Sequence, residues 1–412
     1  MKITLQPKTP LWTGDIDSKS DFIQSTGVMG SLRWWAEAIL RGMGYFACDP
    51  TEDNHRCPKE ANRNNQKIPK YCPACLVFGA TGIRRLFKLE ISGGERVFND
   101  GAINIKPDGR NRGWYLGSGL IGEIDLRTIS LDRDFDDNLV LLPILIASNW
   151  GALGARTQHG YGVVVLEQKK DLKIDDFKNA MKERLKSLNV EERKNVNNKL
   201  PNLKEMFFAK VQFEVQDNDW WKEVDGIRER GRKGDRNYYE GYINDPRMVK
   251  WVNAGSVPIA PAIKNWLRFG KQITIKNGKK MQVSPFKNLS NKSISGWLFG
   301  ESNKDKKSAS KINISCAYKI DNNLWEFRIW GWIPKSDTPN GLEREAFLDS
   351  LKQALSGGGS VTIPWKDLLG NQTSNHKLIV WKEFSSEIDT GKTNESNFKD
   401  FVQSLLQNEG GY

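Results

Sequence analysis

The sequence lacks the residue patterns on which several enzyme classes depend. Its 412 residues include only three histidines, which leaves little room for a catalytic metal site rich in histidine ligands. It has no Ser-His-Asp order of a hydrolase triad, no GxxxxGKS/T phosphate loop and no HExxH motif. No stretch approaches the roughly eighteen apolar residues of a membrane span, and the N-terminus has no apolar signal-peptide core. We therefore expect a cytoplasmic protein that does not cross a membrane.

Acidic residues are the minority among the charged ones, with 50 Asp and Glu against 62 Lys and Arg and a net charge of +12. Such an excess favours a polyanionic partner, and nucleic acid is the commonest. Aromatic residues make up 10% of the chain and include 15 tryptophans. Because exposed bases stack on aromatic side chains, the combination points to single-stranded RNA. A basic protein without such a partner has the same composition, so charge alone does not decide.

Cysteine is scarce, but four of the five cysteines lie between residues 48 and 75. They are Cys48, Cys57, Cys72 and Cys75, and the last two form a Cys-Pro-x-Cys knuckle that presents two thiolates from one turn. In a reducing compartment such a cluster indicates a metal more often than disulfides. We predict a structural zinc site in which Cys48 and Cys57 are the second pair of ligands, or in which His55 replaces one of them. The alternative is a set of free thiols.

Length and composition predict two domains in an α+β fold. We place them at residues 1–204 and 205–412, because a highly charged linker begins at 168 and apolar alternation returns near 208. Residues 43–75 lose periodicity, which predicts an insertion held together by the zinc. The elements predicted for the first domain are a helix at 29–42, a strand at 84–92, a buried apolar helix at 139–150 and a strand at 160–167.

The two halves of the chain repeat each other weakly. With residue 25 placed on residue 256, Arg33 falls on Lys264 and Trp35 falls on Trp266. Each segment is followed, after an insertion, by a Phe-Gly motif ("CLVFGAT" and "GWLFGES") and then by a strand-like stretch. The shared order of three elements indicates two copies of one α+β unit. We expect the two matched tryptophans to pack in the cores of their own units.

Residues 151–162, "GALGARTQHGYG", contain four glycines. Glycine lets a backbone pass close to a phosphate and turn several N–H groups towards it, so Gly154, Arg156 and Gly160 are candidate phosphate contacts. A tight turn that needs positive φ is the alternative. His159 could act as a general base on a ribose hydroxyl. Because we cannot place a second acid or base, we favour a histidine that binds phosphate or backbone without catalysis.

Four stretches together resemble the RAMP superfamily of CRISPR proteins and, within it, the subunit numbered one of the type III-B (Cmr) effector complex. These stretches are "TPLWTGD" (9–15), "GSLRWW" (30–35), "CPACLVFG" (72–79) and "GALGARTQHGYG" (151–162). The glycine-rich loop and the Phe-Gly motif are typical of RAMP proteins, whereas "LRWW" points to this subunit. The second half extends the resemblance with "PAIKNWLR" (261–268) and "WLFGES" (297–302).

The resemblance implies two tandem ferredoxin-like (RRM-like) domains, each a small antiparallel sheet backed by helices. It implies a non-catalytic subunit near the 3′ portion of the guide RNA (crRNA) that, with other Cmr subunits, aids capture of target RNA in antiviral defence. The RNA-facing residues that it implies are Arg33, Arg41, Arg84, Arg85, Gly154, Arg156, His159 and Gly160. We add Trp34, which lies off the apolar face of its helix, as a candidate for stacking on bases. Gln158 and His159 stand where this loop often has two basic residues, which lowers the charge of the loop.

Two other functions compete with this RNA-binding subunit. One is a metal-independent endoribonuclease that processes precursor guide RNA, with His159 as its general base. The other is a zinc-stabilised interaction module that contacts only protein. Nuclease activity that is lost in His159→Ala would favour the first of these, and the absence of salt-dependent RNA affinity would favour the second.

Overall fold

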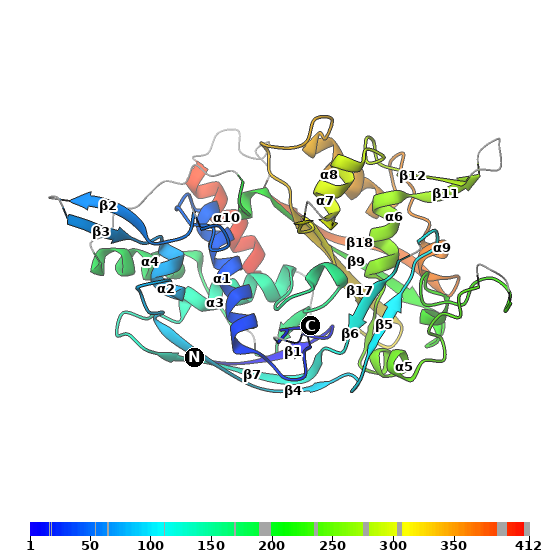
Figure 1. Ribbon diagram of the computed structural model, residues 1–412, viewed down its shortest axis with the longest axis horizontal. Coiled ribbons are helices and arrows are strands. Elements are labelled where there is room, and N and C mark those ends of the chain that lie inside the picture. The colour runs from blue at the N-terminus through cyan, green and yellow to red at the C-terminus, as the bar shows by residue number, and fades with distance from the viewer. Residues whose placement is uncertain are drawn as a thin grey trace.

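The computed structural model describes the chain except residues 16, 18, 54, 64–65, 111, 169, 189–198, 235–237, 275–279, 303–306, 385–393 and 408–412. Part of the predicted charged linker, residues 189–198, therefore lies outside the described residues. Two main antiparallel sheets form the framework, one in each half of the chain, and helices pack against them (Figure 1). This confirms a mixed α and β fold with antiparallel sheets. Within the described part of the chain, no helix combines the length and apolar composition of a membrane span.

The first half is built on a four-stranded sheet with the order β4-β7-β1-β8. Its strands are β1 (Lys2–Pro7), β4 (Phe87–Arg96), β7 (Leu120–Ser130) and β8 (Val164–Leu166). Helix α1 (Ser25–Gly42) follows β1, and helix α3 (Asn138–Trp150) follows β7, so the main elements run βαββαβ. Both helices cover one side of this sheet (Figure 1).

Local sequence explains these elements. Helix α1 buries one apolar face, as the spacing over 29–42 predicts, and α3 is buried on nearly every side because it is almost entirely apolar. Both predicted helices are confirmed. The strand predicted at 160–167 is shorter than expected, because Gly160 and Gly162 have positive φ and only β8 continues into the sheet.

The second half repeats the arrangement. Its larger sheet has the order β10-β16-β17-β9-β18, and β15 also pairs with β17. The strands are β9 (Met206–Val215), β10 (Ser256–Val257), β15 (Ile312–Ile314), β16 (Ala317–Lys319), β17 (Leu324–Trp332) and β18 (Thr373–Glu383). Helix α6 (Ala260–Phe269) follows β9 and β10, and α8 (Arg344–Leu355) follows β17. With β15 and β16 counted as one broken strand, the order of elements and of neighbouring strands is that of the first half.

Smaller elements decorate both sheets. The hairpins are β2 (Lys59–Arg63) with β3 (Gln66–Lys70), β5 (Ala102–Ile105) with β6 (Trp114–Gly117), β11 (Lys271–Thr274) with β12 (Lys280–Val283), and β13 (Glu301–Ser302) with β14 (Lys307–Ser308). The remaining α-helices are α2 (Pro73–Phe78), α4 (Ile174–Ser187), α5 (Pro246–Asn253), α7 (Lys292–Phe299), α9 (Trp365–Leu369) and α10 (Asn394–Leu406). Short 3-10 turns lie at Thr157–His159, Leu203–Glu205 and Trp220–Glu223.

Two hydrophobic cores form, and each takes residues from both halves. The core of the first half includes Phe208 and Trp330 from the second sheet, together with helix α10, which packs against α3. The core of the second half includes Trp12 and Phe98. The division at residues 204 and 205 stays a prediction, and the interleaved cores show that the halves are joined by more than a linker.

Candidate functional site

The four clustered cysteines meet in the structure. Their Sγ atoms all lie within 4.8 Å of one another, and all four side chains are buried. The main-chain N–H of Cys48 donates to Cys72 Sγ at 3.5 Å, and that of Cys72 donates to Cys57 Sγ at 3.3 Å. Hydrogen bonds from N–H groups favour the charged thiolate, which is the form that binds metals. The four cysteines of residues 43–75 thus form one ordered cluster that packs into the core of the first half.

The donor set fits zinc. Four buried thiols, two of them from the turn at Cys72 and Cys75, suit a closed tetrahedral site. Hydrogen bonds with the other three cysteines lower the pKa of Cys48, whereas hydrogen bonds with Cys48 and Cys57 raise the pKa values of Cys72 and Cys75, so the cluster does not hold four thiolates before a metal binds. His55 lies outside the cluster: its side chain is exposed and pairs with Glu52. The structure therefore favours a four-cysteine ligand set over the set with His55.

Arg33 serves this cluster in the structure. Its guanidinium donates to Cys75 Sγ at 3.1 Å, to the Gly79 carbonyl at 2.8 Å and to Glu37 at 2.8 Å. Glu37 is buried, and the nearby thiols and the acid hold the pKa of Arg33 above its ordinary value despite the opposing effect of burial. A cation beside four sulfur atoms offsets the charge that metal binding would concentrate there.

Arg41, one turn further along α1, is also committed to protein acceptors. It is 3% exposed, and its guanidinium donates to the carbonyl oxygens of Ala47, Cys48 and Pro201 at 2.9–3.1 Å. For Arg33 and Arg41 to contact RNA, as the resemblance implies, both would have to give up these hydrogen bonds. The structure brings the two arginines to the thiol cluster rather than to an open surface.

Other candidates on this side are exposed. Trp34 is 36% exposed and lies edge-on to the buried Trp35, so one of its faces is open to solvent. Arg84 is exposed, with Asp132 3.9 Å away, and Arg85 is half-buried beside it in the turn between α2 and β4. The structure leaves both arginines and Trp34 able to contact a ligand, and does not bring them next to the glycine-rich loop.

The glycines of residues 151–162 have a reason within the protein. A Cβ on Gly154 would lie 2.4 Å from the Trp12 carbonyl oxygen, and one on Gly160 would lie 2.6 Å from the backbone nitrogen of Cys316. Both have positive φ, and the Cys316 N–H donates to the Gly160 carbonyl at 3.0 Å. These glycines pack the loop against the two halves, so a bulky substitution there would break the fold as well as any phosphate cradle.

Arg156 and His159 project from this loop. Arg156 has a left-handed backbone (φ 56°) and lies over the Trp12 ring at 3.8 Å, which is a cation–π contact. The pKa of His159 falls to about 4 because the ring is buried and faces the positive charges of Lys264 and Arg156. Its Nδ1 is buried and has no hydrogen-bond partner in the described structure. At neutral pH His159 is an uncharged ring among cations.

Lys264 on α6 was not among the functional residues predicted from the sequence. It is 4% exposed, and burial together with nearby Arg268 lowers its pKa to about 7. The structure assigns its ammonium no acidic partner among the described residues. One feature of the sequence could have indicated Lys264. In the internal repeat it falls on Arg33, so both helices have a basic residue at the same position.

The positive charge continues beyond Lys264. Burial and the nearby charge of Arg110, from the segment after β5, lower the pKa of Arg268, one turn along α6, and Glu301 opposes this effect. The Arg110 guanidinium lies over the Phe269 ring at 4.0 Å, and its buried Nε has no hydrogen-bond partner in the described structure. We call Arg110, Arg156, Lys264 and Arg268 the basic row. It joins the glycine-rich loop of the first half to α6 of the second.

In both halves an arginine side chain donates a hydrogen bond to the glycine carbonyl of the Phe-Gly motif. Arg33 on α1 donates to the Gly79 carbonyl at 2.8 Å, and Arg268 on α6 donates to the Gly300 carbonyl at 3.0 Å. Both glycines have positive φ and follow a short helix, α2 or α7. The structure thus bears out the repeated order of helix and Phe-Gly motif seen in the sequence.

Comparison with known proteins bears on the first half most directly. Residues 4–165 match the RAMP superfamily. No curated protein sequence matches the chain. Similar solved structures include Cmr1 from Pyrococcus furiosus, at 16% identity over 83% of this chain and 90% of that one, with a TM-score of 0.34. Another is a type III-B Cmr-beta complex bound to cognate target RNA, at 10% identity over 84% of this chain and 96% of that one, with a TM-score of 0.33.

Both TM-scores are low, so the family assignment rests on the sequence match alone. The matched segment contains all four motifs on which the resemblance was based, "TPLWTGD", "GSLRWW", "CPACLVFG" and "GALGARTQHGYG". The predicted resemblance to the RAMP superfamily is confirmed for residues 4–165, which match that family.

Proposed function

We propose that this protein is a non-catalytic, RNA-binding subunit of a type III-B (Cmr) CRISPR effector. The RAMP match supports the class, and the shared βαββαβ order of both sheets supports two tandem ferredoxin-like domains. In this proposal the partners are guide RNA, target RNA and other Cmr subunits, and the setting is antiviral defence in the cytoplasm.

The basic row is the observation that carries the proposal. Lys264 is buried beside the like charge of Arg268, and their repulsion costs stability in the free protein, although Glu301 offsets part of the Arg268 charge. A polyanion that lies along Arg110, Arg156 and Arg268 would remove this repulsion, because each phosphate neutralises a neighbouring charge. The basic row includes residues of both halves, so an RNA strand bound along it would contact both halves at once.

The thiol cluster has a structural role in this proposal. Cys48, Cys57, Cys72 and Cys75 would hold one zinc ion, and zinc bound there would keep all four thiolates deprotonated and fix the insertion against α1. Arg33 then contributes charge compensation rather than an RNA contact. In this proposal the zinc ion takes no direct part in RNA binding.

His159 supports a binding role better than a catalytic one. A ring with a pKa of about 4 is a weak base at neutral pH, and the charged groups that face it, Arg156 and Lys264, are cations. No carboxylate faces the ring among the described residues. An endoribonuclease with His159 as its general base would have to use a cation such as Lys264 as its second acid–base group.

The test is a salt series on the purified chain. Fluorescence anisotropy with a labelled single-stranded RNA should show an affinity that falls steeply as salt rises, because several phosphates are neutralised. The same RNA should remain uncut after prolonged incubation with wild type and with His159→Ala. An affinity that does not depend on salt would contradict the proposal, and cleavage that His159→Ala abolishes would establish the endoribonuclease instead.

A further inference from the structure

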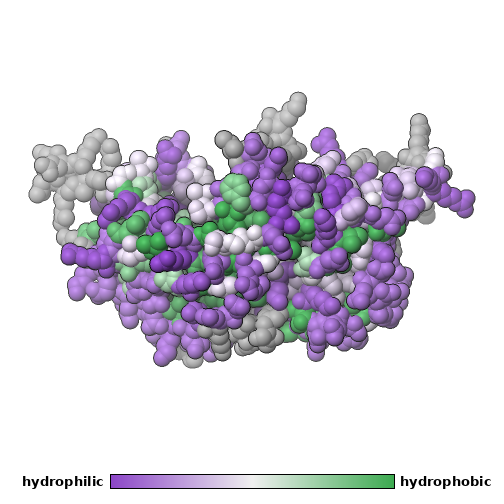
Figure 2. Space-filling model, turned by 90° about the horizontal axis from the view of Figure 1, so that it is seen from below, coloured by the Kyte–Doolittle hydropathy of each residue, from purple (hydrophilic) through white to green (hydrophobic). Residues whose placement is uncertain are grey.

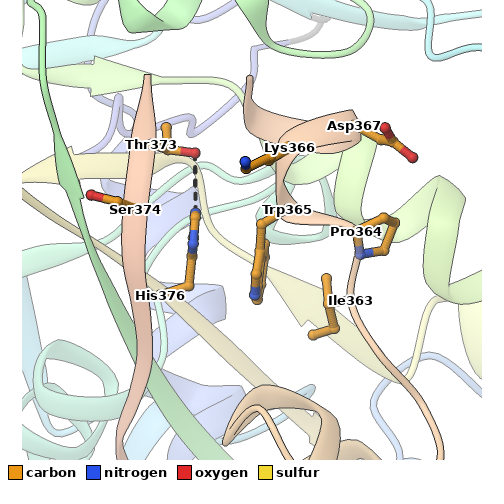
Figure 3. A pocket seen from close by; sticks show the side chains of 8 residues that line it. All are labelled: Ile363, Pro364, Trp365, Lys366, Asp367, Thr373, Ser374 and His376. Atoms are coloured by element: carbon orange, nitrogen blue, oxygen red, sulfur yellow. Dashed lines mark hydrogen bonds between the residues drawn. The ribbon is translucent and has the colours of Figure 1, made fainter. Parts of the chain in front are cut away.

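A second binding feature lies in the second half, away from the glycine-rich loop. A cavity of about 410 Å³ opens between α9 and the start of strand β18. Its lining combines aromatic, aliphatic and polar side chains and includes Trp365, His376, Lys366, Ser374 and Ile363 (Figure 3). A volume of this order suits a small-molecule-sized group rather than a single water.

The cavity is organised around a column of parallel rings. His376 stacks on Phe213 with centroids 5.6 Å apart and 16° between planes, and Trp365 stacks on His376 at 4.8 Å and 5°. Figure 3 shows the Trp365 and His376 rings face to face, with Ile363 and Pro364 on the other side of Trp365. The outermost ring of the column, Trp365, is half-buried.

The column is uncharged. Burial lowers the pKa of His376 to about 4, and its Nε2 lies 3.2 Å from the Thr373 hydroxyl. That hydroxyl already donates to the Gly370 carbonyl at 2.9 Å, so the His376 Nε2–H is the donor and the ring is a neutral imidazole. His376 covers one face of Trp365, so another planar group could stack only on the opposite face, which is turned towards Ile363 and Pro364.

Polar groups surround this face. Lys366 and Asp367 are both exposed at the rim, and the Ser374 hydroxyl lines the same cavity. Figure 3 shows the Asp367 carboxylate turned away from the Lys366 ammonium. An ammonium at the rim, in a chain with a net charge of +12, favours an anionic ligand that carries a planar ring. A nucleotide has both parts: its base can stack on the indole, and its phosphate can pair with the lysine.

Contacts link the cavity to the basic row. The Leu368 carbonyl of α9 accepts from the N–H of Asp225, and the Asp225 carboxylate accepts from the N–H of Asp108 at 3.0 Å. Asp108 lies two residues before Arg110 and accepts from Asn265 on α6 at 3.3 Å. The cavity and the row are thus held in one rigid network, and one RNA strand could engage both.

We propose that this cavity binds one nucleotide of single-stranded RNA, with the base stacked on Trp365 and the phosphate on Lys366. The proposal rests on the RNA-binding function above and adds a base-stacking site to it. Because every base offers a flat face, the site should tolerate any sequence.

Two substitutions of one residue test it. Trp365→Leu keeps apolar bulk and removes the ring, whereas Trp365→Phe keeps a ring. Trp365→Leu should weaken binding of single-stranded RNA by about five-fold or more, because stacking on one base is lost, and Trp365→Phe should restore most of it. The salt slope should be the same in both, since no phosphate contact changes. Melting curves of both variants check that the second half stays folded.

A second measurement does not depend on RNA affinity. In wild type labelled with 5-fluorotryptophan, the resonance assigned to Trp365 by its loss in Trp365→Phe should shift on titration with AMP. Lys366→Gln should reduce this shift. If AMP shifts Trp365 but the chain shows no salt-dependent RNA affinity, the cavity is confirmed and the RNA-binding function fails. If RNA binds but AMP leaves Trp365 unmoved and Trp365→Leu binds RNA like wild type, the cavity proposal is overturned.

Discussion

Helices α1 and α6 occupy the same place in the two halves and use their cations in opposite ways. In α1, Arg33 lies between Glu37 and the Cys75 thiol, and each of its three side-chain nitrogens donates a hydrogen bond. In α6, the matching Lys264 has no acidic partner in the described structure. With residue 25 placed on 256, Glu37 falls on Arg268, so the acid that neutralises one helix is replaced by a base in the other.

This difference shows what decides the role of a buried cation. A basic residue at a given helical position is a structural element when an acid or a thiolate stands beside it. Without such a partner it is a source of positive potential that an external anion can relieve. The comparison therefore separates the side of the thiol cluster, at α1, from the side of the basic row, at α6, where we propose that RNA binds. The variants below are designed to break or sharpen that separation.

The largest effect should follow from removing a ligand of the thiol cluster. Cys75→Ser should reduce bound zinc from about one ion per chain to near none, since a structural tetrahedral site needs all four ligands. Proteolysis should then attack residues 43–75 while the second half stays resistant. Metal analysis by mass spectrometry and limited proteolysis measure this. Cys316→Ala, at a buried cysteine outside the cluster, is the control and should keep the metal. Wild type that folds without any metal would refute the site.

The two matched tryptophans should come next. Trp35 and Trp266 are 2% and 5% exposed, so truncation to alanine should cost roughly 3–5 kcal/mol of unfolding free energy at either site. We expect the larger loss at Trp35, because its indole also donates to the Ala152 carbonyl at 3.0 Å. Urea denaturation followed by circular dichroism measures both. Trp34→Ala, which removes an exposed ring, should change stability little. A Trp35→Ala variant as stable as wild type would mean that the two helices are not equivalent.

Stability should respond in opposite directions to Arg33→Met and Lys264→Met. Arg33→Met leaves the buried Glu37 without its closest partner and should destabilise the protein by about 1–3 kcal/mol. Lys264→Met replaces an unpaired buried ammonium by an apolar chain of similar length and should be neutral or stabilising at pH 7. Thermal melting of both variants in the absence of RNA tests this. Destabilisation by Lys264→Met would show that its ammonium has a partner.

The same lysine predicts a pH dependence. Its pKa is about 7 in the folded chain and 10.5 in its unperturbed state, so the unfolded chain binds more protons between these values. Lys264 should therefore make the free protein more stable as pH rises from about 7 to about 10.5. Subtracting the pH–stability curve of Lys264→Met from that of wild type isolates the effect. A difference curve that is flat over this range would show that the lysine is not desolvated.

Sequence patterns predicted the local elements and the chemistry that depends on spacing. The period of α1, the apolar run of α3 and the Cys-Pro-x-Cys knuckle each leave a local signal, and each was found where it was predicted. The spacing does indicate Glu37, four residues from both Arg33 and Arg41, as their partner. Their other partners left no signal, because they lie up to 160 residues away. Burial of a cation is set by tertiary packing, so the RNA-facing set predicted from the family included two arginines that bond to protein.

Lys264 and the column of stacked rings at Trp365 are functional candidates that the sequence did not predict. Nothing in the spacing of "PAIKNWLR" distinguishes a buried lysine without a partner from an exposed one. Likewise, Phe213, Trp365 and His376 are distant in sequence and become one stack only when α9 packs on β18. The hydropathy of one whole face of the molecule (Figure 2), with hydrophobic residues gathered towards its middle and hydrophilic ones around them, likewise arises only from the fold.

The most direct test of the separation between the two helices is the salt dependence of RNA affinity in two charge-matched variants. Arg110→Gln removes a cation of the basic row, and Arg33→Gln removes one at the thiol cluster. We predict that Arg110→Gln weakens single-stranded RNA of any sequence and flattens the plot of log affinity against log salt by about 0.7 for the lost phosphate contact. Arg33→Gln should keep the wild-type slope and lose stability or metal instead. A slope that falls in Arg33→Gln and is unchanged in Arg110→Gln would contradict the account.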